Sequence, residues 1–332
     1  MIEPPADLPA ASIVARVRDR YGIDVRAATF LPVGNDSRAW SFRLDGHGHR
    51  WFLKVLARVD ANAIELPRFL SARGIAHVAP AISTRDHSGF DRDDPYTFAL
   101  YPFIDGSTGG ARGLTATQRE ELGRFLRQLH ETRPDGALEA LLRREGFTIR
   151  DERYIEAASA SLEVGPPDEL AATLLTAWRD RAEEIKYALV RARELATTAR
   201  QAAPSLVLCH ADFHAWNVLI DPSGEMYVVD WDEALLAPKE RDLMFVSGDI
   251  ADIDPSGEHF FRGYGEVDID PALIAYYRFD WVLQEVADYH RRVFDVDLGK
   301  QTRAEAVTSF AELFGPDDVV AAALRGERAI GS

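Results

Sequence analysis

The sequence has little that would place the protein outside the cell or in a membrane. Its 332 residues include a single cysteine, Cys209, which excludes an internal disulfide framework and a zinc site built from cysteines. No apolar run approaches the roughly 18 residues that a membrane-spanning helix needs. The first ten residues, MIEPPADLPA, lack the basic and apolar regions of a signal peptide. We therefore expect a cytoplasmic protein without membrane association.

Basic residues are also scarce, and the shortage is confined to one part of the chain. Residues 1–104 carry 13 basic and 12 acidic side chains, whereas residues 105–332 carry 25 basic and 42 acidic ones. A negative field repels nucleic acid and attracts cations, although many acidic surfaces serve only solubility. The charge therefore favours a small cationic partner over nucleic acid. No feature of the sequence indicates an obligate protein partner.

The pattern of apolar residues changes about a third of the way along the chain. The first third predicts a helix, then strands rich in β-branched and aromatic residues with a DGHGH hairpin turn, at 11–22, 25–33, 38–44, 49–57 and 95–106. The remainder is mostly helical, with short strands around residues 205–230. We predict an α+β, bilobal fold, with a small antiparallel-sheet lobe at 1–104, a hinge about 101–110 and a larger helical lobe at 105–332.

The stretch CHADFHAWNVLID, residues 209–221, concentrates polar side chains between two apolar runs. On an extended strand, His210, Asp212 and His214 would point the same way and could bind a metal ion. Such a site usually needs a further ligand, and the sequence indicates no companion cluster elsewhere. The metal-site hypothesis therefore stays open beside a second one.

The second hypothesis is phosphoryl transfer. Asp212 and Asn217 have the spacing H-x-D-x-x-x-x-N, and Asp230 follows in the apolar stretch YVVDWD. In phosphoryl transfer an Asp accepts the proton of the attacking hydroxyl, while a downstream Asn and a second Asp hold Mg²⁺ on the phosphates. This order predicts Asp212 as the base, with Asn217 and Asp230 as metal ligands.

Such a site also needs groups that bind the nucleotide phosphates. Lys54 lies inside the apolar stretch RWFLKVLA, where an ammonium group is costly unless it has a function or reaches solvent. Upstream, Gly34, Asn35 and Ser37 lie at a turn between strands, where exposed backbone N–H groups could cover phosphates. A solvent-facing lysine and an ordinary turn are the alternatives to these two interpretations.

Five stretches together resemble the aminoglycoside phosphotransferase family, whose fold is that of the protein kinases. In chain order they are FLKV, YPFIDG, LGRFLRQLH, CHADFHAWNVLID and VVDWDEALLAPKERDLMF, and the order holds from about residue 30 to residue 300. The last stretch, with FFRGYGEV and AYYRFDWVLQEVADYH after it, looks like the spectinomycin phosphotransferase branch. The resemblance implies a protein-kinase-like fold and transfer of the γ-phosphate of ATP or GTP, with Mg²⁺, to a hydroxyl of an aminocyclitol or aminoglycoside.

The resemblance also implies roles for individual residues. It makes Asp212 the catalytic base, Asn217 and Asp230 the Mg²⁺ ligands and Lys54 the phosphate contact. In ALYPFIDG the carbonyl of Pro102 and the N–H of Ile104 should meet the adenine edge. His210 is expected to orient the loop and His130 to pack within a helix.

Two departures from the protein kinases stand out. Glu65 would be the candidate ion-pair partner of Lys54, but Pro67 prefers the first turn of a helix, which would put Glu65 at or before the helix start. Trp231 and Asp232 stand where protein kinases carry Phe-Gly, and no A-P-E segment follows. A protein substrate is therefore not expected.

The acidic lobe offers carboxylates to a cationic substrate. Glu285 and Asp288 share one face of the predicted helix FDWVLQEVADYH, and Asp232 lies beside the metal site. The resemblance makes this helix a candidate substrate wall, with Trp281 or Tyr289 packing on the ring. The alternative is a surface helix whose aromatic residues face the core.

Three functions remain open on the sequence. The first is an antibiotic kinase that inactivates spectinomycin, and the second is a kinase of another small metabolite such as an amino alcohol or a sugar. The third is a non-catalytic nucleotide-binding protein, which the presence of Lys54, Asp212 and Asp230 disfavours. A family resemblance determines the chemistry better than the acceptor.

Overall fold

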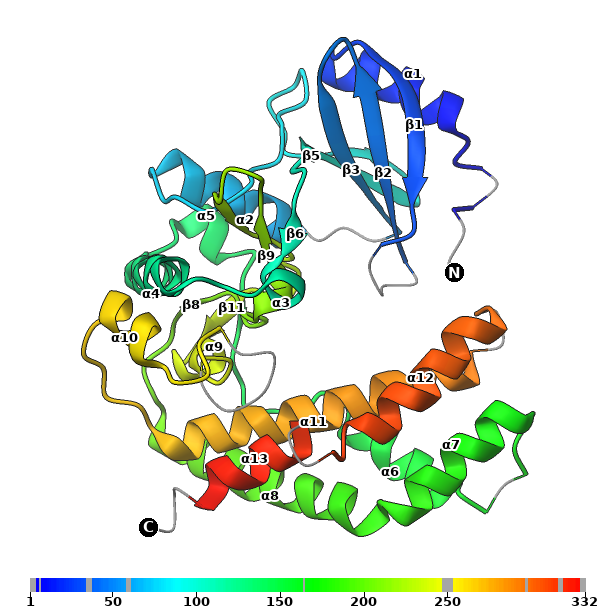
Figure 1. Ribbon diagram of the computed structural model, residues 1–332, viewed down its shortest axis with the longest axis vertical. Helices are drawn as coiled ribbons and strands as arrows, with labels where there is room; N and C mark the ends of the chain where they lie inside the picture. Colours follow the sequence, from blue (N-terminus) through cyan, green and yellow to red (C-terminus); the bar gives the residue numbers. More distant parts are fainter. Residues whose placement is uncertain are drawn as a thin grey trace.

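The computed structural model describes most of the chain. The described residues are 4–5, 7–33, 38–57, 61–163, 165–246, 253–295, 298–315 and 319–328. Figure 1 shows a small sheet at one end of the molecule and a larger, mainly helical part at the other. The predicted α+β, bilobal architecture is therefore confirmed. Among the described residues, no helix is long and apolar enough to cross a membrane.

The small sheet is antiparallel throughout. Its strands are β1 (Val25–Leu31), β2 (Ala39–Gly46), β3 (Arg50–Leu56), β5 (Tyr96–Pro102) and β4 (Asp91–Asp93), in that spatial order. The expected hairpin joins β2 to β3, and Gly48 supplies the positive φ of 74° that its turn requires. In this register Lys54 lies between Ser41 of β2 and Ala99 of β5. Lys54 is thus in the centre of the sheet rather than on an edge.

Helix α1 (Ala10–Tyr21) covers one face of this sheet. Its buried side chains, Ile13, Val17 and Tyr21, recur every four residues and join the core of the sheet. The helix ends at Gly22, whose left-handed conformation lets its N–H bond to the Arg18 carbonyl at 3.1 Å. The Tyr21 hydroxyl donates to the Phe98 carbonyl at 2.6 Å and ties the helix to β5.

Helix α2 corrects one expectation from the sequence. It covers Ala61–Ala72 with Pro67 inside it, so Glu65 lies within the helix and not at or before its start. A proline inside a helix removes one backbone hydrogen bond, but here Leu66, Pro67 and Leu70 are all buried. Leu66 and Leu70 pack into the core of the larger part, and this burial offsets the lost bond. The two parts thus share packing through α2, and a division at residue 104 stays a prediction.

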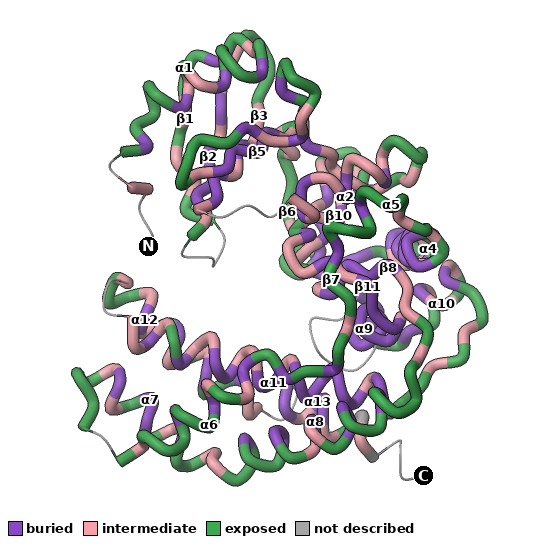
Figure 2. The backbone as a smooth tube through the Cα atoms, turned by 180° about the vertical axis from the view of Figure 1, so that it is seen from behind, coloured by how far each residue is buried: buried purple, intermediate pink, exposed green. Residues whose placement is uncertain are grey.

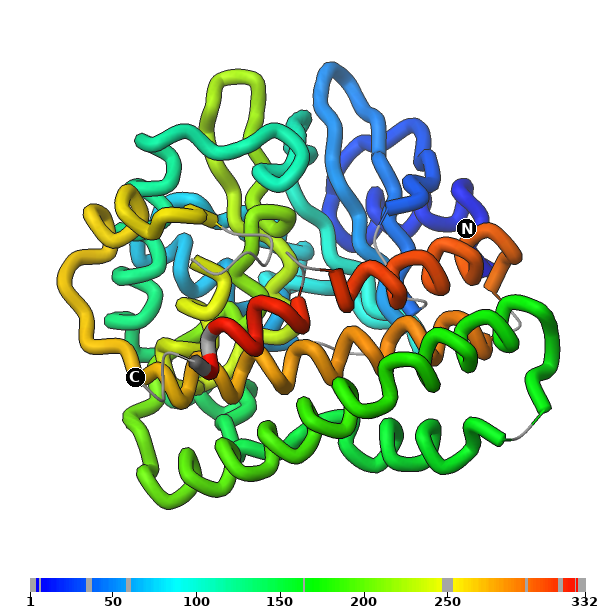
Figure 3. The backbone as a smooth tube through the Cα atoms, turned by 60° about the horizontal axis from the view of Figure 1, so that its bottom comes forward, coloured from blue at the N-terminus to red at the C-terminus, as the bar shows by residue number. Residues whose placement is uncertain are grey.

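The larger part contains the remaining helices and several short strands. Its helices are α3 (Gly109–Arg112), α4 (Ala116–Glu131), α5 (Gly136–Glu139), α6 (Glu152–Ala160), α7 (Glu169–Asp180), α8 (Ala182–Ala202), α9 (Glu240–Leu243), α10 (Glu258–Tyr264), α11 (Pro271–Phe294), α12 (Lys300–Glu312) and α13 (Val319–Arg328). The helix α11 is central, since α8, α12 and α13 all pack against it, as Figure 3 shows from below. Figure 2 shows buried residues along α4 and α11.

Helices α4 and α10 approach each other closely because each has a glycine at the contact. A Cβ on Gly123 would lie 2.1 Å from the Phe260 carbonyl oxygen, and one on Gly263 would lie 1.9 Å from the Glu120 carbonyl oxygen. No larger residue fits at either position without moving a helix. This packing supports α4, which carries His130 toward the predicted catalytic loop.

Two three-stranded sheets hold the predicted catalytic segments. The first has the order β10 (Met226–Val228), β9 (Val218–Ile220) and β6 (Ser107–Thr108), and the second has the order β7 (Arg143–Arg144), β11 (Leu235–Ala237) and β8 (Val207–Cys209). The segment with Asp212 connects β8 to β9, and its 3-10 helix η1 covers Ala215–Asn217. Asp230 is the second residue after β10. Each of these two segments therefore follows a strand that is packed in the hydrophobic core.

Candidate active site

A single buried carboxylate anchors the start of the loop that carries Asp212. Asp242, on α9, accepts the backbone N–H of His210 at 3.0 Å and that of Ala211 at 2.6 Å. It also lies 3.0 Å from Nε2 of His130 on α4. Ala211 has a positive φ of 71°, a conformation that costs energy for a residue with a side chain. The bonds from Asp242 hold this turn, which directs the next residue, Asp212, away from the core.

His210 is fully buried and holds the loop from the inside. Its Nε2 lies 3.0 Å from the Val229 carbonyl, and its Nδ1 accepts the backbone N–H of Asp212 at 3.3 Å. Burial lowers the pKa of His210, so the ring is neutral at neutral pH. Because both ring nitrogens are engaged, His210 cannot join Asp212 and His214 in a metal site. The contacts agree with the orienting role that we expected.

Among the described residues, one group of side chains has atoms close enough together to hold a metal ion, and it is not the predicted one. It comprises His130, Cys209 and Asp242. Both ring nitrogens of His130 already have partners, the Tyr264 hydroxyl at 2.7 Å and Asp242. Burial raises the pKa of the Cys209 thiol, which keeps the sulfur protonated and a poor ligand. These contacts make the group a structural anchor, and they place His130 in the core as expected.

The Asp212 carboxylate is held by two residues of its own loop. Asn217 donates its side-chain amide to Oδ2 of Asp212 at 2.8 Å and to the Asp212 carbonyl at 2.9 Å. His214 places Nε2 at 3.4 Å from Oδ1. Burial alone would raise the pKa of Asp212, but the contact with His214 and the charges of His210 and Arg241 together lower it by more, and the net shift is downward. The carboxylate is therefore ionised and oriented, as a proton acceptor must be.

Lys54 of β3 reaches the segment that follows β10. Its Nζ lies 3.0 and 3.2 Å from the two carboxylate oxygens of Asp232 and 3.4 Å from Oδ1 of Asp230. Burial lowers the pKa of Lys54, but these two carboxylates raise it by more, and the net shift is upward. The contact joins the small sheet to the predicted metal ligands across about 180 residues of sequence. Asp232 thus contacts Lys54 within the chain, and its predicted contact with a substrate stays a prediction.

The donors at the predicted metal site suit Mg²⁺. Because the Asn217 amide nitrogen is bonded to Asp212, its carbonyl oxygen is the atom left to serve as a ligand. The Asp230 side chain is half exposed, at 51%, and the residue has a positive φ of 64° in the turn after β10. Carboxylate and amide oxygens are the ligands that Mg²⁺ prefers. Asn217 and Asp230 would therefore be able to hold the ion between the loop and the turn after β10.

The predicted adenine contacts lie at the end of β5. Pro102 is exposed and pairs with Trp51 as the last residue of the strand, and Ile104 follows it half-buried in the connection to the larger part. In the described part of the chain, the Ile104 N–H has no backbone acceptor. It is thus available to an adenine edge. Gly34, Asn35 and Ser37 lie outside the described residues.

Helix α11 faces the catalytic loop with the predicted substrate residues. Glu285 is close enough to Asp212 for the two charges to interact, and Asp288 forms an ion pair with Arg292 at 2.5 Å. Burial, followed by the charge of Asp288, raises the pKa of Glu285 to about 7. Tyr289 hydrogen-bonds Glu285. A carboxyl with this pKa changes charge near neutral pH, beside the predicted base.

Aromatic contacts connect the same helix to the loop. The Trp281 ring meets Phe245 edge-on with centroids 5.0 Å apart, and Phe245 meets His214 at 5.6 Å. Trp281 is only partly buried, so part of the ring stays open. The structure thus brings α11, His214 and Asp212 together. Sequence reasoning considered His214 only as a candidate metal ligand and assigned no role to Asp242, although Asp242 lies within the stretch KERDLMF that carries the resemblance.

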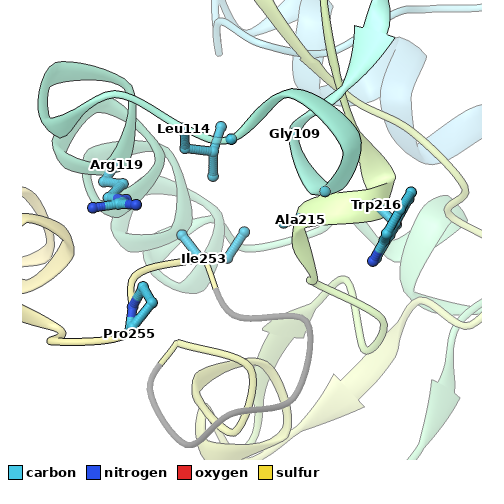
Figure 4. Close-up of a pocket in the computed structure, with 9 residues that line it drawn as sticks. Gly109, Leu114, Arg119, Ala215, Trp216, Ile253 and Pro255 are labelled. Carbon is cyan, nitrogen blue, oxygen red and sulfur yellow. The ribbon is translucent and has the colours of Figure 1, made fainter.

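A cavity is lined by Ala215 and Trp216 of the loop and by residues of α3 (Figure 4). Trp216 stands against α3, where a Cβ on Gly110 would come within 2.4 Å of its ring. Leu114, Ile253 and Arg119 also line the cavity. None of the predicted catalytic or metal residues does. The cavity is thus distinct from the candidate active site.

Comparison with known proteins agrees with this geometry. A model of the phosphotransferase enzyme family matches residues 27–281. The structure is similar to that of spectinomycin phosphotransferase APH(9)-Ia in complex with ADP and spectinomycin, with 29% identity, a TM-score of 0.88, and coverage of 96% of this chain and 99% of that chain. The AMP-bound complex of the same enzyme gives a TM-score of 0.83 at 29% identity, with 96% and 98% coverage.

More distant structures share the fold alone. An aminoglycoside phosphotransferase from Alicyclobacillus acidocaldarius has a TM-score of 0.59 at 15% identity, with 99% of this chain and 98% of that chain covered. A comparison with curated protein sequences gives no match. The family match alone extends over well more than half of the sequence. The chain, with its protein-kinase-like fold, therefore belongs to the phosphotransferase enzyme family.

Proposed function

We propose that the protein transfers the γ-phosphate of ATP to a hydroxyl of a cationic aminocyclitol, with spectinomycin as the substrate. The observation that carries this proposal is the position of Asp212. Its ionised carboxylate is fixed by Asn217, lies near Glu285 of α11, and belongs to the loop that leads to the predicted metal ligands. The similarity to the ADP and spectinomycin complex of APH(9)-Ia extends along nearly the whole of both chains and supports the same substrate.

In this proposal the chain supplies positioning and charge rather than a covalent intermediate. Asp212 orients the acceptor hydroxyl and takes its proton late in the transfer. Lys54 binds the nucleotide phosphates, while Pro102 and Ile104 bind the adenine edge. Mg²⁺, held by Asn217 and Asp230, would neutralise charge on the phosphates. A nucleotide complex is known for APH(9)-Ia with ADP and with AMP, which supports ATP as the phosphate donor.

The acceptor side of the proposal depends on α11. A cationic ring would lie between the catalytic loop and the face of the helix that carries Trp281, Glu285 and Asp288. Glu285 offers a carboxyl that a nearby ammonium group would hold in its ionised form. The exposed part of the Trp281 ring would pack on the substrate. Asp288 contributes negative charge at the rim, although Arg292 compensates part of it.

The test is an assay of ADP release with Mg-ATP and spectinomycin, beside streptomycin, kanamycin and hygromycin as comparison acceptors. Release that depends on spectinomycin, with a product heavier by one phosphate, would establish the proposal. The Asp212→Asn protein, run in parallel, controls for background ATP hydrolysis. Transfer to another small alcohol instead would keep the chemistry and replace the acceptor. Nucleotide binding without release on any acceptor would contradict the proposal.

A further inference from the structure

Lys54 needs a carboxylate partner because of its place in the sheet. It lies on the central strand β3, its side chain is only 22% exposed, and its sequence neighbours Leu53 and Val55 are buried. A partly buried ammonium group is costly unless an opposite charge faces it. In a phosphotransferase this partner also decides where the ammonium group points, and so whether it can meet the phosphates. The identity of the partner is therefore a question about nucleotide binding.

Glu65, the candidate partner that the sequence offered, does not hold the ammonium group of Lys54. Both carboxylate oxygens of Glu65 have other partners. Oε2 accepts Nε of Arg68 at 3.1 Å, and Oε1 accepts the backbone N–H of Gly89 at 3.1 Å. Gly89 fits closely there, because a Cβ on it would lie 2.5 Å from Oε1. Arg68 in turn bonds the Ala81 carbonyl and the Ser83 hydroxyl, so Glu65 belongs to a network that fixes α2.

Asp232 supplies the charge instead, and buried contacts of Trp231 hold the turn around it. Both of its oxygens lie within 3.2 Å of the Lys54 Nζ, which is closer than the contact to Asp230 at 3.4 Å. The intervening Trp231 is buried, donates Nε1 to the Val228 carbonyl at 3.1 Å, and has its ring 4.6 Å from that of His210. With Trp231 fixed, the carboxylates at positions 230 and 232 both face the ammonium group.

We infer that Asp232 is the positioning residue for Lys54, in place of an acid on the helix α2. Asp232 holds the ammonium group at the phosphate site, which leaves Asp230 available to a metal ion. This inference rests on the proposed phosphotransfer function, but the contact itself exists in the chain without nucleotide. Without Asp232, Lys54 keeps Asp230 as its partner and would compete with the metal ion for it.

The test is a double-mutant cycle with a matched control. Lys54→Met, Asp232→Asn and the double variant are melted in the nucleotide-free state in EDTA, and ADP binding is then measured in the same buffer. Glu65→Gln and its combination with Lys54→Met form the control cycle. Glutamine keeps the oxygen that accepts from Gly89. We expect coupling of a few degrees in melting temperature for the pair 54 and 232, and additive effects for the pair 54 and 65.

Kinetics separate a positioning role from a merely structural one. Asp232→Asn should raise the KM for nucleotide about tenfold while kcat falls less, which corresponds to loss of one charged contact. Asp232→Glu should restore part of the KM, and Asp232→Asn should change KM little once Lys54 is already Met. If Asp232→Asn does not fold, Asp232→Ser takes its place in the cycle.

Two results would overturn the inference. One is coupling of Lys54 to Glu65 and not to Asp232 in the melting cycle. The other is an undiminished effect of Asp232→Asn in the Lys54→Met background, which would make Asp232 a direct contact of metal or substrate. The melting cycle needs neither acceptor nor turnover. It therefore tests this inference even if the protein phosphorylates none of the acceptors.

Discussion

The side-chain amide of Asn217 donates to the Asp212 carboxylate at 2.8 Å, so the predicted metal ligand also fixes the predicted base. This single contact orients both residues. The amide nitrogen is bonded to Asp212, which leaves the Asn217 oxygen as the atom that can face the metal ion. The geometry explains why the spacing of four intervening residues matters, since η1 brings the two side chains together.

Replacement of Asp212 should remove catalysis and keep nucleotide binding. Asp212→Asn retains the size of the side chain but cannot accept the proton, and general-base catalysis contributes about 10²–10⁴-fold. We expect kcat to fall by that amount with ADP affinity nearly unchanged. Steady-state kinetics and calorimetric titration with ADP would measure both. If the variant has the same kcat as the parent protein, Asp212 is not the catalytic base.

Replacement of Asp242 should destabilise the whole larger part of the protein. Asp242→Ala leaves the buried N–H groups of His210 and Ala211, and the ring of His130, without an acceptor. The loss of such a buried network costs about 2–4 kcal/mol of unfolding free energy. Urea unfolding followed by fluorescence would measure the change. Asp268→Ala, at an exposed position, is the control and should differ little from the parent protein.

The pH dependence of stability should report Glu285. The unfolded chain releases this proton near pH 4.5, whereas the folded chain keeps it until about pH 7. Between these values the folded state binds more protons, so its contribution to stability falls as pH rises through the window. Glu285→Gln should remove this contribution. We would measure the unfolding free energies of the variant and of the parent protein from pH 4 to pH 8. The value for the variant minus the value for the parent should increase as the pH rises.

The same group should control the affinity for a cationic acceptor. Ionised Glu285 attracts an ammonium group and neutral Glu285 does not, so the acceptor KM should fall as pH rises through about 7. In Glu285→Gln this dependence should be absent and KM should stay high. An uncharged alcohol acceptor, if one is accepted, provides the comparison. A parent protein whose acceptor KM does not change from pH 6 to pH 8 would speak against a contact with Glu285.

The Mg²⁺ concentration that activity requires should show whether Asp230 is a metal ligand. Asp230→Asn keeps one oxygen donor but loses the charge, so half-maximal activity should require more Mg²⁺ than in the parent protein. The variant should still bind ADP in EDTA, because the predicted adenine contacts, Pro102 and Ile104, lie at the end of β5 and just after it. Activity titrated with MgCl₂ at saturating ATP would measure the shift. An unchanged Mg²⁺ requirement would contradict the assignment of Asp230 as a ligand.

The sequence by itself determined the helices and strands and the order of the predicted site residues, because both depend on residues that are near one another in the chain. Runs rich in β-branched and aromatic residues predicted the strands around Lys54. The order and spacing of Asp212, Asn217 and Asp230 predicted a shared site, because phosphoryl transfer needs these residue types in this order. The structure places Nζ of Lys54 3.4 Å from Oδ1 of Asp230, and the roles of these residues stay predictions.

Only the tertiary structure decided which partners these residues have. Pro67 lies inside α2 because burial of its neighbours outweighs one backbone bond, and this corrected the place of Glu65. Lys54 pairs with Asp232, and Asp242 anchors the loop from 32 residues away. The local sequence cannot show which carboxylate pairs with a given lysine, since every acidic residue in the chain attracts it. The contacts of Glu65 with Arg68 and Gly89 and the buried turn at Trp231 determine which carboxylate reaches Lys54.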